Sequence, residues 1–453
     1  MPPAASPAPQ GDERPIRDGG DACPGALRLH TADDGALARV RIPAGVLAAD
    51  QAHALADAAE RLGDGSLDVT SRGNVQLRGL DDGCGAELAR LLDAAGLLPA
   101  PRHERVRNIV ASPLSGLDGR GHADVQPWAR ALDRLLCASE SATALSGRFL
   151  FAFDDGRGDV AALGPDVTIL AQPAGQALLL VAGDPKPVRI GANDTARAAL
   201  LAADAFLAAA GATRAWRVRE LPPQARLSAA AVAERLAAHG LDATFPAEPG
   251  ETPLAPAPPA IPELGIVAGP AGRSLSVLAR LGRLTAAQWR TLAAVAAHDG
   301  TAELRVTPWR GIVLPGLTAA AAPPRLAELA DAGLVTAAHD PWAGVGACTG
   351  RPGCAKSLTD VRADACAAVQ AATEQPAGVL PVYWSGCERR CGHPQGTDWT
   401  DAVATPDGYE ISVRRSGHAP AGQSPSLPRG VPTPALADAI AAARTPPVTE
   451  QTQ

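Results

Sequence analysis

Two distant parts of the chain show the same order of hydrophobic patterns, first helical and then strand-like. Within 48–63 and again within 285–300, apolar residues recur every three to four positions, which predicts an amphipathic helix in each part. The stretches "LDVTSRGNVQLRG" and "LRVTPWRGIVLPG" follow these helices, and their alternation of apolar and polar residues predicts two half-buried strands joined by a turn. With one more strand before each helix, each part is predicted to be a strand, a helix and a pair of strands.

The two parts are copies of one sequence. Residues 37–80 overlay residues 274–317 at a shift of 237 positions without a gap, and 15 of the 44 pairs are identical. Thr285 with Gln288 predicts a helix capping box in the second copy, whereas the first copy has alanine at the capping position. Gly63 and Gly300 are predicted to be the C′ glycines that end the two helices.

The duplication predicts an internally duplicated α+β fold. We expect two ferredoxin-like (βαββ) half-domains, each followed by a larger mixed α/β lobe, arranged around a pseudo-twofold cleft. The first lobe should contain two capped helices, from about Thr195 to Gly211 and from Ser228 to Gly240. The expected segments are a disordered N-terminus at 1–25, the first half-domain at 26–98, the first lobe at 99–246, a Pro-rich linker at 247–262, the second half-domain at 263–320, the second lobe at 321–416, and a tail at 417–453 with a short helix near Ala435.

Composition narrows the class of protein. A chain of 453 residues with 46% apolar residues is expected to fold into two or more domains. The N-terminus lacks the apolar stretch of a signal peptide and no apolar run is as long as a membrane span, so we expect a cytoplasmic protein with no membrane partner. The net charge of −7 argues against nucleic acid as a partner, so an anionic ligand would have to meet a local basic patch.

Four of the eight cysteines form two close pairs. Cys348 and Cys354 flank a Gly-Arg-Pro-Gly bend, and Cys387 and Cys391 follow in "WSGCERRCGHP". Such thiols can hold a [4Fe–4S] cluster, bind zinc or form disulfides; disulfides suit a cytoplasmic chain poorly, and structural zinc usually has closer ligand spacing. Gly350, Gly353, Gly386 and Gly392 in these loops favour a cluster, because backbone must approach its sulfides, but zinc and an absence of metal stay open on spacing alone.

The C-x5-C and C-x3-C pairs, placed in the second half of a duplicated chain, resemble the nitrite/sulfite reductase superfamily. The resemblance covers about residues 27–416 and implies that the four cysteines hold a [4Fe–4S] cluster, with Cys391 beside a tetrapyrrole in the cleft. "TSRGNVQLRG" is similar to the strand with which that family places an arginine over the tetrapyrrole, which gives this role to Arg72, with Gln76 on the same strand face. "RNIVASP" is similar to the family's Arg-Asn segment and adds Arg107 and Asn108 as substrate-binding residues.

The third basic element departs from the reductase pattern. Reductases carry a lysine, an aromatic residue and then a lysine or asparagine, whereas this chain has Arg148, Phe149 and Leu150. Arginine keeps its charge and grips carboxylates bidentately, while lysine is the better proton donor to a small oxyanion. A site of arginines therefore favours a polycarboxylate ligand, and Arg310 in the second copy's turn is a further candidate for binding it.

The segments "ACPGALRLH", "VTPWRGIVLPG" and "SGCERRCGHP" resemble the precorrin-3B synthase branch of this superfamily. The resemblance implies an iron–sulfur monooxygenase that uses O2 to hydroxylate precorrin-3A at C20, with formation of a γ-lactone, in cobalamin biosynthesis. Electrons would come from a donor protein or an NAD(P)H-linked reductase, since no G-x-G-x-x-G motif opens a convincing βαβ unit. A second, non-haem iron is a further expectation, with His393 as its candidate ligand; the sequence does not assign the catalytic residues.

Two other functions fit the same sequence features. An assimilatory sulfite or nitrite reductase would carry sirohaem together with the cluster, and its purified form would show the strong absorption of that tetrapyrrole. A non-catalytic redox sensor would keep the scaffold and the cluster but would not turn over precorrin-3A.

Overall fold

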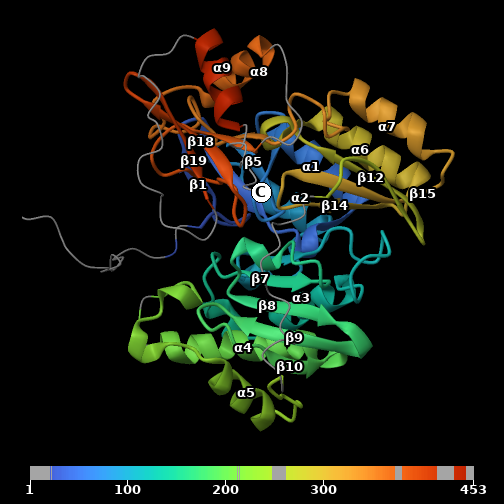
Figure 1. The fold of residues 1–453 in the computed structure, drawn as a ribbon, viewed down its shortest axis with the longest axis vertical. Coiled ribbons are helices and arrows are strands. Elements are labelled where there is room, and N and C mark those ends of the chain that lie inside the picture. Colours follow the sequence, from blue (N-terminus) through green and yellow to red (C-terminus); the bar gives the residue numbers. More distant parts are fainter. Residues whose placement is uncertain are drawn as a thin grey trace, which may run out of the picture.

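The computed structural model describes residues 21, 23–211, 213, 215–246, 262–372, 380–415 and 433–444. Most of the expected N-terminal segment and of the Pro-rich linker, and the tail apart from its helix, lie outside these residues. Figure 1 shows the first lobe in green below the two half-domains, with the second lobe in orange and red beside them.

Each half-domain opens with a hairpin that precedes the predicted strand, helix and strand pair. The elements of the first are β1 (His30–Ala32), β2 (Gly35–Val40), β3 (Val46–Ala48), α1 (Ala49–Leu62), β4 (Ser66–Val69), β5 (Val75–Leu80) and α2 (Gly85–Ala94). Those of the second are β11 (Gly265–Gly269), β12 (Gly272–Leu278), β13 (Arg283–Thr285), α6 (Ala286–Asp299), β14 (Glu303–Val306), β15 (Gly311–Leu317) and α7 (Ala322–Asp331). The element orders are identical, which confirms the predicted duplication.

The half-domains exchange the three-residue strands β3 and β13. The sheet orders are β1-β2-β5-β4-β13 and β11-β12-β15-β14-β3, so each sheet is completed by a strand from the other copy. Leu284 of β13 lies opposite Leu67 of β4, and Leu47 of β3 lies opposite Leu304 of β14. A shift of 237 positions converts one pair into the other, and α1 packs against α6 between the two sheets. The two copies therefore share one hydrophobic core and are related by a pseudo-twofold axis.

The helix ends agree with the sequence in part. The Thr285 side chain accepts a hydrogen bond from Gln288 N, and Thr285 N donates to Gln288 Oε1 at 2.9 Å, which confirms the capping box. Gly63 and Gly300 end the helices, but the prediction that they are C′ glycines is wrong: they are the C-cap residues, and their φ angles of −125° and −111° are not left-handed. They are glycines because a Cβ would lie 2.6 Å from the Arg78 carbonyl oxygen and 2.8 Å from that of Pro315.

The two lobes share a sheet pattern in which three parallel strands are followed by an antiparallel one. The first lobe has β6 (Ile109–Ala111), α3 (Gln126–Ala138), β7 (Phe151–Asp154), β8 (Val167–Gln172), β9 (Gln176–Val181), β10 (Val188–Gly191), α4 (Thr195–Ala210) and α5 (Ala229–Ala238). The second has β16 (Val345–Ala347), α8 (Val361–Ala371), β17 (Val382–Ser385), β18 (Trp399–Thr405), β19 (Gly408–Arg414) and α9 (Thr433–Arg444). The helices expected in the first lobe and near Ala435 are present, and no helix of the described segments could cross a membrane.

Equivalent turns attach each lobe to its half-domain. Ala44 and Leu281 lie in short 3-10 turns, at 43–45 and 280–282, and both have positive φ angles, 57° and 52°. A left-handed non-glycine residue costs about 1–2 kcal/mol. Burial offsets that cost, because Ala44 joins the core of the first lobe and Leu281 that of the second. The lobes are therefore held in matching positions on the duplicated half-domains.

Candidate cluster and anion-binding site

The two cysteine pairs lie at one edge of the second lobe. Cys348 follows β16 and Cys387 follows β17, and these strands are parallel neighbours whose carboxyl ends meet at the same edge. Gly386 N donates to Cys348 Sγ at 3.2 Å, so the two loops touch next to their cysteines. Burial raises the pKa of the Cys348 thiol, and nearby charge on Cys391 and Cys354 would raise it further. The loops thus place thiols from both pairs close together.

The loops fit an iron–sulfur cluster. All four thiols are free of disulfide bonds, and the backbone is tightly packed, since a Cβ on Gly386 would lie 1.8 Å from Ser357 Oγ. Within the described residues, no three His, Cys, Asp or Glu side chains converge as ligands of one metal ion. Four thiolates around a [4Fe–4S] cube surround the cube instead of meeting at a point, because they bind four different iron atoms. The four cysteine thiolates of these loops would hold such a cluster.

A group of arginines gathers between the first half-domain and the first lobe; we call it the arginine cluster. Its members are Arg39, Arg41, Arg72, Arg148 and Arg217. Arg72 Nη1 donates to the Arg148 carbonyl at 3.2 Å, and Arg39 Nη2 donates to Gln76 Oε1 at 3.0 Å. Burial lowers the pKa of Arg72 to about 9, and the charges of Arg217, Arg41 and Arg39 contribute to the shift.

Carboxylates only partly neutralise the arginine cluster. Asp166, which is fully buried, accepts from Arg217 Nε at 2.5 Å, and Glu220 lies 3.4 Å from Arg148 Nη1. Arg39, Arg41 and Arg72 have no carboxylate partner in the part of the chain that the structure describes. The whole chain has two lysines, Lys186 and Lys356, and neither belongs to the cluster. The site therefore offers several guanidinium groups to an anion and no ammonium group.

The other residues of the predicted Arg-Asn and Arg-Phe-Leu segments serve the scaffold. Arg107 makes a bidentate pair with Asp133, with both N–O distances at 2.7 Å. Asn108 is fully buried, accepts from Asn74 Nδ2 and donates to the Phe149 carbonyl.

Leu150 occupies the position at which reductases carry a polar group. It is buried in a small apolar cluster with Val110, Ala152 and Val160, against which Trp309 packs. The third polar group of a small-anion site is thus replaced by hydrocarbon.

Arg310 of the second copy contacts the loop that carries Cys391, and His393 lies in that loop. Arg310 Nη2 donates to the Gly392 carbonyl at 2.6 Å and lies 3.2 Å from Tyr383 Oη. His393 stacks on Trp399, with 5.4 Å between ring centroids, and its Nδ1 lies 2.8 Å from the Arg390 carbonyl oxygen.

Strand β5 connects the arginine cluster to the cysteine loops. Gln76 contacts Arg39, and Arg78, two residues further on the same face, donates to the Gly353 carbonyl at 2.7 Å beside Cys354. Arg78 also makes a bidentate pair with Asp34, at 2.7 and 2.8 Å. Alternate residues of a strand are about 7 Å apart. Neighbouring side chains on one face of β5 therefore contact both candidate sites.

Sequence reasoning missed four of these arginines. Arg39 lies on β2 and Arg41 directly follows it, and Arg78 stands two positions after Gln76 on β5, so period-two spacing could have placed these side chains. No spacing pattern in the sequence marks Arg217. It reaches the cluster because its loop packs on Asp166.

The model of the nitrite/sulfite reductase ferredoxin-like half domain matches this chain twice, at residues 30–95 and 268–332. A precorrin-3B synthase from Sinorhizobium sp is 30% identical over 399 residues, which are 86% of this chain and 82% of that protein. A ferredoxin–nitrite reductase from Synechococcus elongatus is 39% identical over 127 residues, which are 27% of this chain and 25% of that protein.

Among solved structures, the Mycobacterium tuberculosis NirA protein has the same fold. The TM-score is 0.70 at 20% identity, over 90% of this chain and 79% of that one. The repeated half-domain and the similarity along most of the chain agree with the internal duplication and the two lobes. The chain therefore belongs to the nitrite/sulfite reductase superfamily, a group of oxidoreductases.

Proposed function

We propose that the protein is a precorrin-3B synthase, an O2-dependent monooxygenase that hydroxylates precorrin-3A at C20 with formation of a γ-lactone. One oxygen atom of O2 enters the substrate, and the other leaves as water after taking up two electrons and two protons. The observation that carries the proposal is the arginine cluster, whose guanidinium groups suit a polycarboxylate. The similarity to the precorrin-3B synthase of Sinorhizobium sp over most of both chains supports it.

In this proposal the chain's own residues bind and orient the substrate. Arg72, Arg39 and Arg41 receive its carboxylates, because the described residues give these three guanidinium groups no acidic partner. Arg217 is positioned through Asp166, which also accepts from Leu150 N, and so ties the cluster to Leu150, the residue before β7. The apolar Leu150 removes one polar contact to a small oxyanion, which favours a large ligand over sulfite or nitrite.

Cys348, Cys354, Cys387 and Cys391 would hold a [4Fe–4S] cluster, which supplies electrons when bound. Arg78 bonds to Asp34 and to the Gly353 carbonyl, and these bonds would fix the distance between the [4Fe–4S] cluster and the arginine cluster. A ferredoxin-like protein or an NAD(P)H-linked reductase would deliver the electrons. A second, non-haem iron remains part of the proposal, with His393 as its candidate ligand.

The test is aerobic turnover. Anaerobically reconstituted protein receives precorrin-3A, a ferredoxin with its NADPH-linked reductase, and then ¹⁸O2. We expect a product that gains one labelled oxygen atom, detected by mass spectrometry. Intact iron and sulfide content without any labelled product would instead indicate the redox sensor.

The sulfite or nitrite reductase is the second candidate, because the local similarity to a nitrite reductase reaches 39%. It requires sirohaem in the purified protein and reduction of sulfite to sulfide or of nitrite to ammonia. The same preparation decides this from its visible spectrum, where strong tetrapyrrole bands would overturn the monooxygenase proposal.

A further inference from the structure

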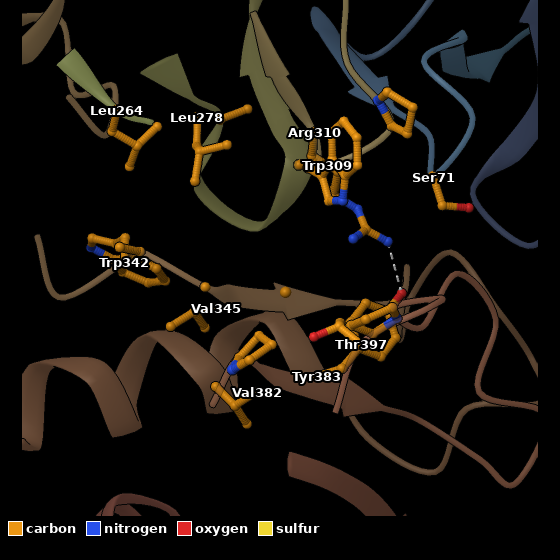
Figure 2. A pocket seen from close by; sticks show the side chains of 18 of the residues that line it. Ser71, Leu264, Leu278, Trp309, Arg310, Trp342, Val345, Val382, Tyr383 and Thr397 are labelled. Atoms are coloured by element: carbon orange, nitrogen blue, oxygen red, sulfur yellow. Dashed lines mark hydrogen bonds between the residues drawn. The ribbon is translucent and has the colours of Figure 1, made fainter. Parts of the chain in front are cut away.

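A cavity lies between the second half-domain and the second lobe, with a volume of about 630 Å³. Figure 2 shows its two facing walls, one from the half-domain strands and the other from the lobe. Apolar and aromatic side chains line most of it, including Leu264, Leu278, Trp309, Trp342, Val345 and Val382. This volume is in the range of cavities that bind small molecules.

The cavity is the duplicate of the site that holds the arginine cluster. At the shift of 237 positions, Leu278 is the copy of Arg41 and Trp309 is the copy of Arg72. The turns that carry them have the same backbone bonds, since Thr70 N donates to the Asn74 carbonyl and Thr307 N to that of Gly311. Strands β16 and β17 bound this cavity, in the places that β6 and β7 take in the first lobe.

Compared with the site of the arginine cluster, the duplicate cavity has lost most but not all of its positive charge. Arg310 stands where the first copy has Gly73 and keeps the left-handed backbone of that glycine, with φ angles of 62° and 64°. Its guanidinium projects into the cavity in Figure 2. Nη2 donates to the Gly392 carbonyl, and both partners of this nitrogen are neutral oxygens. In the described segments, no carboxylate forms an ion pair with Arg310.

We propose that this cavity is a second ligand site, which binds a planar aromatic molecule carrying one anionic group. The ring occupies the apolar part beside Trp309 and Trp342, and the anion pairs with Arg310. Aromatic walls favour a flat ring by burial and by ring contacts, and an un-neutralised guanidinium favours an anion. None of the five arginines of the arginine cluster lines this cavity, so the inference goes beyond the proposed function.

Two probes with the same ring system test the site. 1-Anilinonaphthalene-8-sulfonate carries an anionic group, and N-phenyl-1-naphthylamine is its neutral counterpart; both become fluorescent in apolar surroundings. With full-length reconstituted protein we expect saturable binding of both. Trp309→Ala should weaken both probes at least tenfold, because it removes the largest ring of the wall. Arg310→Met should weaken the sulfonate about tenfold and change the neutral probe less than twofold.

Two matched variants are the controls. Trp128→Ala removes a half-buried tryptophan from α3 of the first lobe, and Arg72→Met removes an arginine from the arginine cluster. Neither should change the binding of either probe by more than about twofold. The unchanged neutral probe also reports that Arg310→Met is folded. The inference fails if binding is not saturable, if Arg72→Met weakens the sulfonate as much as Arg310→Met does, or if Arg310→Met weakens both probes alike.

Discussion

Replacing Arg72 with methionine should make the ligand-free protein more stable and a poorer binder. A pKa of about 9 in place of 12.5 means that burial and the neighbouring arginines disfavour the charged side chain. At 1.36 kcal/mol per unit this is a cost of about 5 kcal/mol at neutral pH. Water reaching the half-buried guanidinium relieves part of it, and Arg72→Met also loses the bond to the Arg148 carbonyl, worth about 1 kcal/mol. We expect a net gain of about 1–3 kcal/mol, seen as a Tm higher by a few degrees.

The pH dependence of this gain has a definite sign. The folded state releases the Arg72 proton at a lower pH than the unfolded state does, so the stability of the native protein rises as pH passes through about 9. The difference in Tm between Arg72→Met and the native protein should therefore narrow between pH 8 and 10. Arg39, whose pKa is lowered to about 10 by burial and by Arg41, should behave in the same way at slightly higher pH.

The assay combines thermal unfolding with ligand binding. Tm is measured by differential scanning fluorimetry across pH, and binding of precorrin-3A is measured under anaerobic conditions. Loss of one charge-assisted contact of about 1.5–3 kcal/mol should weaken binding tenfold to hundredfold. Arg90→Met is the control, because that side chain is 70% exposed on α2 and should change neither quantity. A lower Tm for Arg72→Met, loss of iron and sulfide, or unchanged tetrapyrrole affinity would refute the assignment of Arg72 as a ligand-binding residue.

Three further predictions concern the cysteine loops and the helix caps. Cys391→Ser should lower iron and acid-labile sulfide per chain, and an unaltered iron count would show that Cys391 is not a ligand. Arg78→Met should raise the rate at which air removes iron from the reconstituted protein severalfold, because it frees the Gly353 carbonyl; equal rates would mean that Arg78 does not hold the loop. Thr285→Ala should cost about 1 kcal/mol in urea unfolding and Ala48→Thr should gain a similar amount, since the second copy has the full capping box and the first has half of it; equal midpoints would contradict this.

The scaffold was largely predictable because its signals are local and occur twice. Helix and strand periods, the Thr285 capping box and the shift of 237 positions gave both half-domains without knowledge of their packing. The exchange of β3 and β13 was not predictable, because each strand has three residues and pairs equally well by pattern with its own copy or with the other. The packing of α1 against α6 brings the two copies close enough for the exchange.

The arginine cluster could be predicted from the sequence only in part. Arg72 contacts Arg148 and Gln76 contacts Arg39, whereas Arg107 is paired with Asp133, a residue of α3 with no marker in the sequence. Arg217 joins from a loop more than a hundred residues beyond Arg72. Long arginine side chains follow the nearest carboxylate or carbonyl, and those partners come from elements far apart along the chain.

The sequence by itself determined the duplication, the types of its elements and the two cysteine pairs, because these depend on residue spacing within short segments. Only the tertiary structure decided which guanidinium groups face one another without acidic partners among the described residues, which strands cross between the copies, and that the duplicate of the arginine cluster is an apolar cavity. These features depend on burial and on the balance of charge in three dimensions, and no local pattern along the chain encodes them.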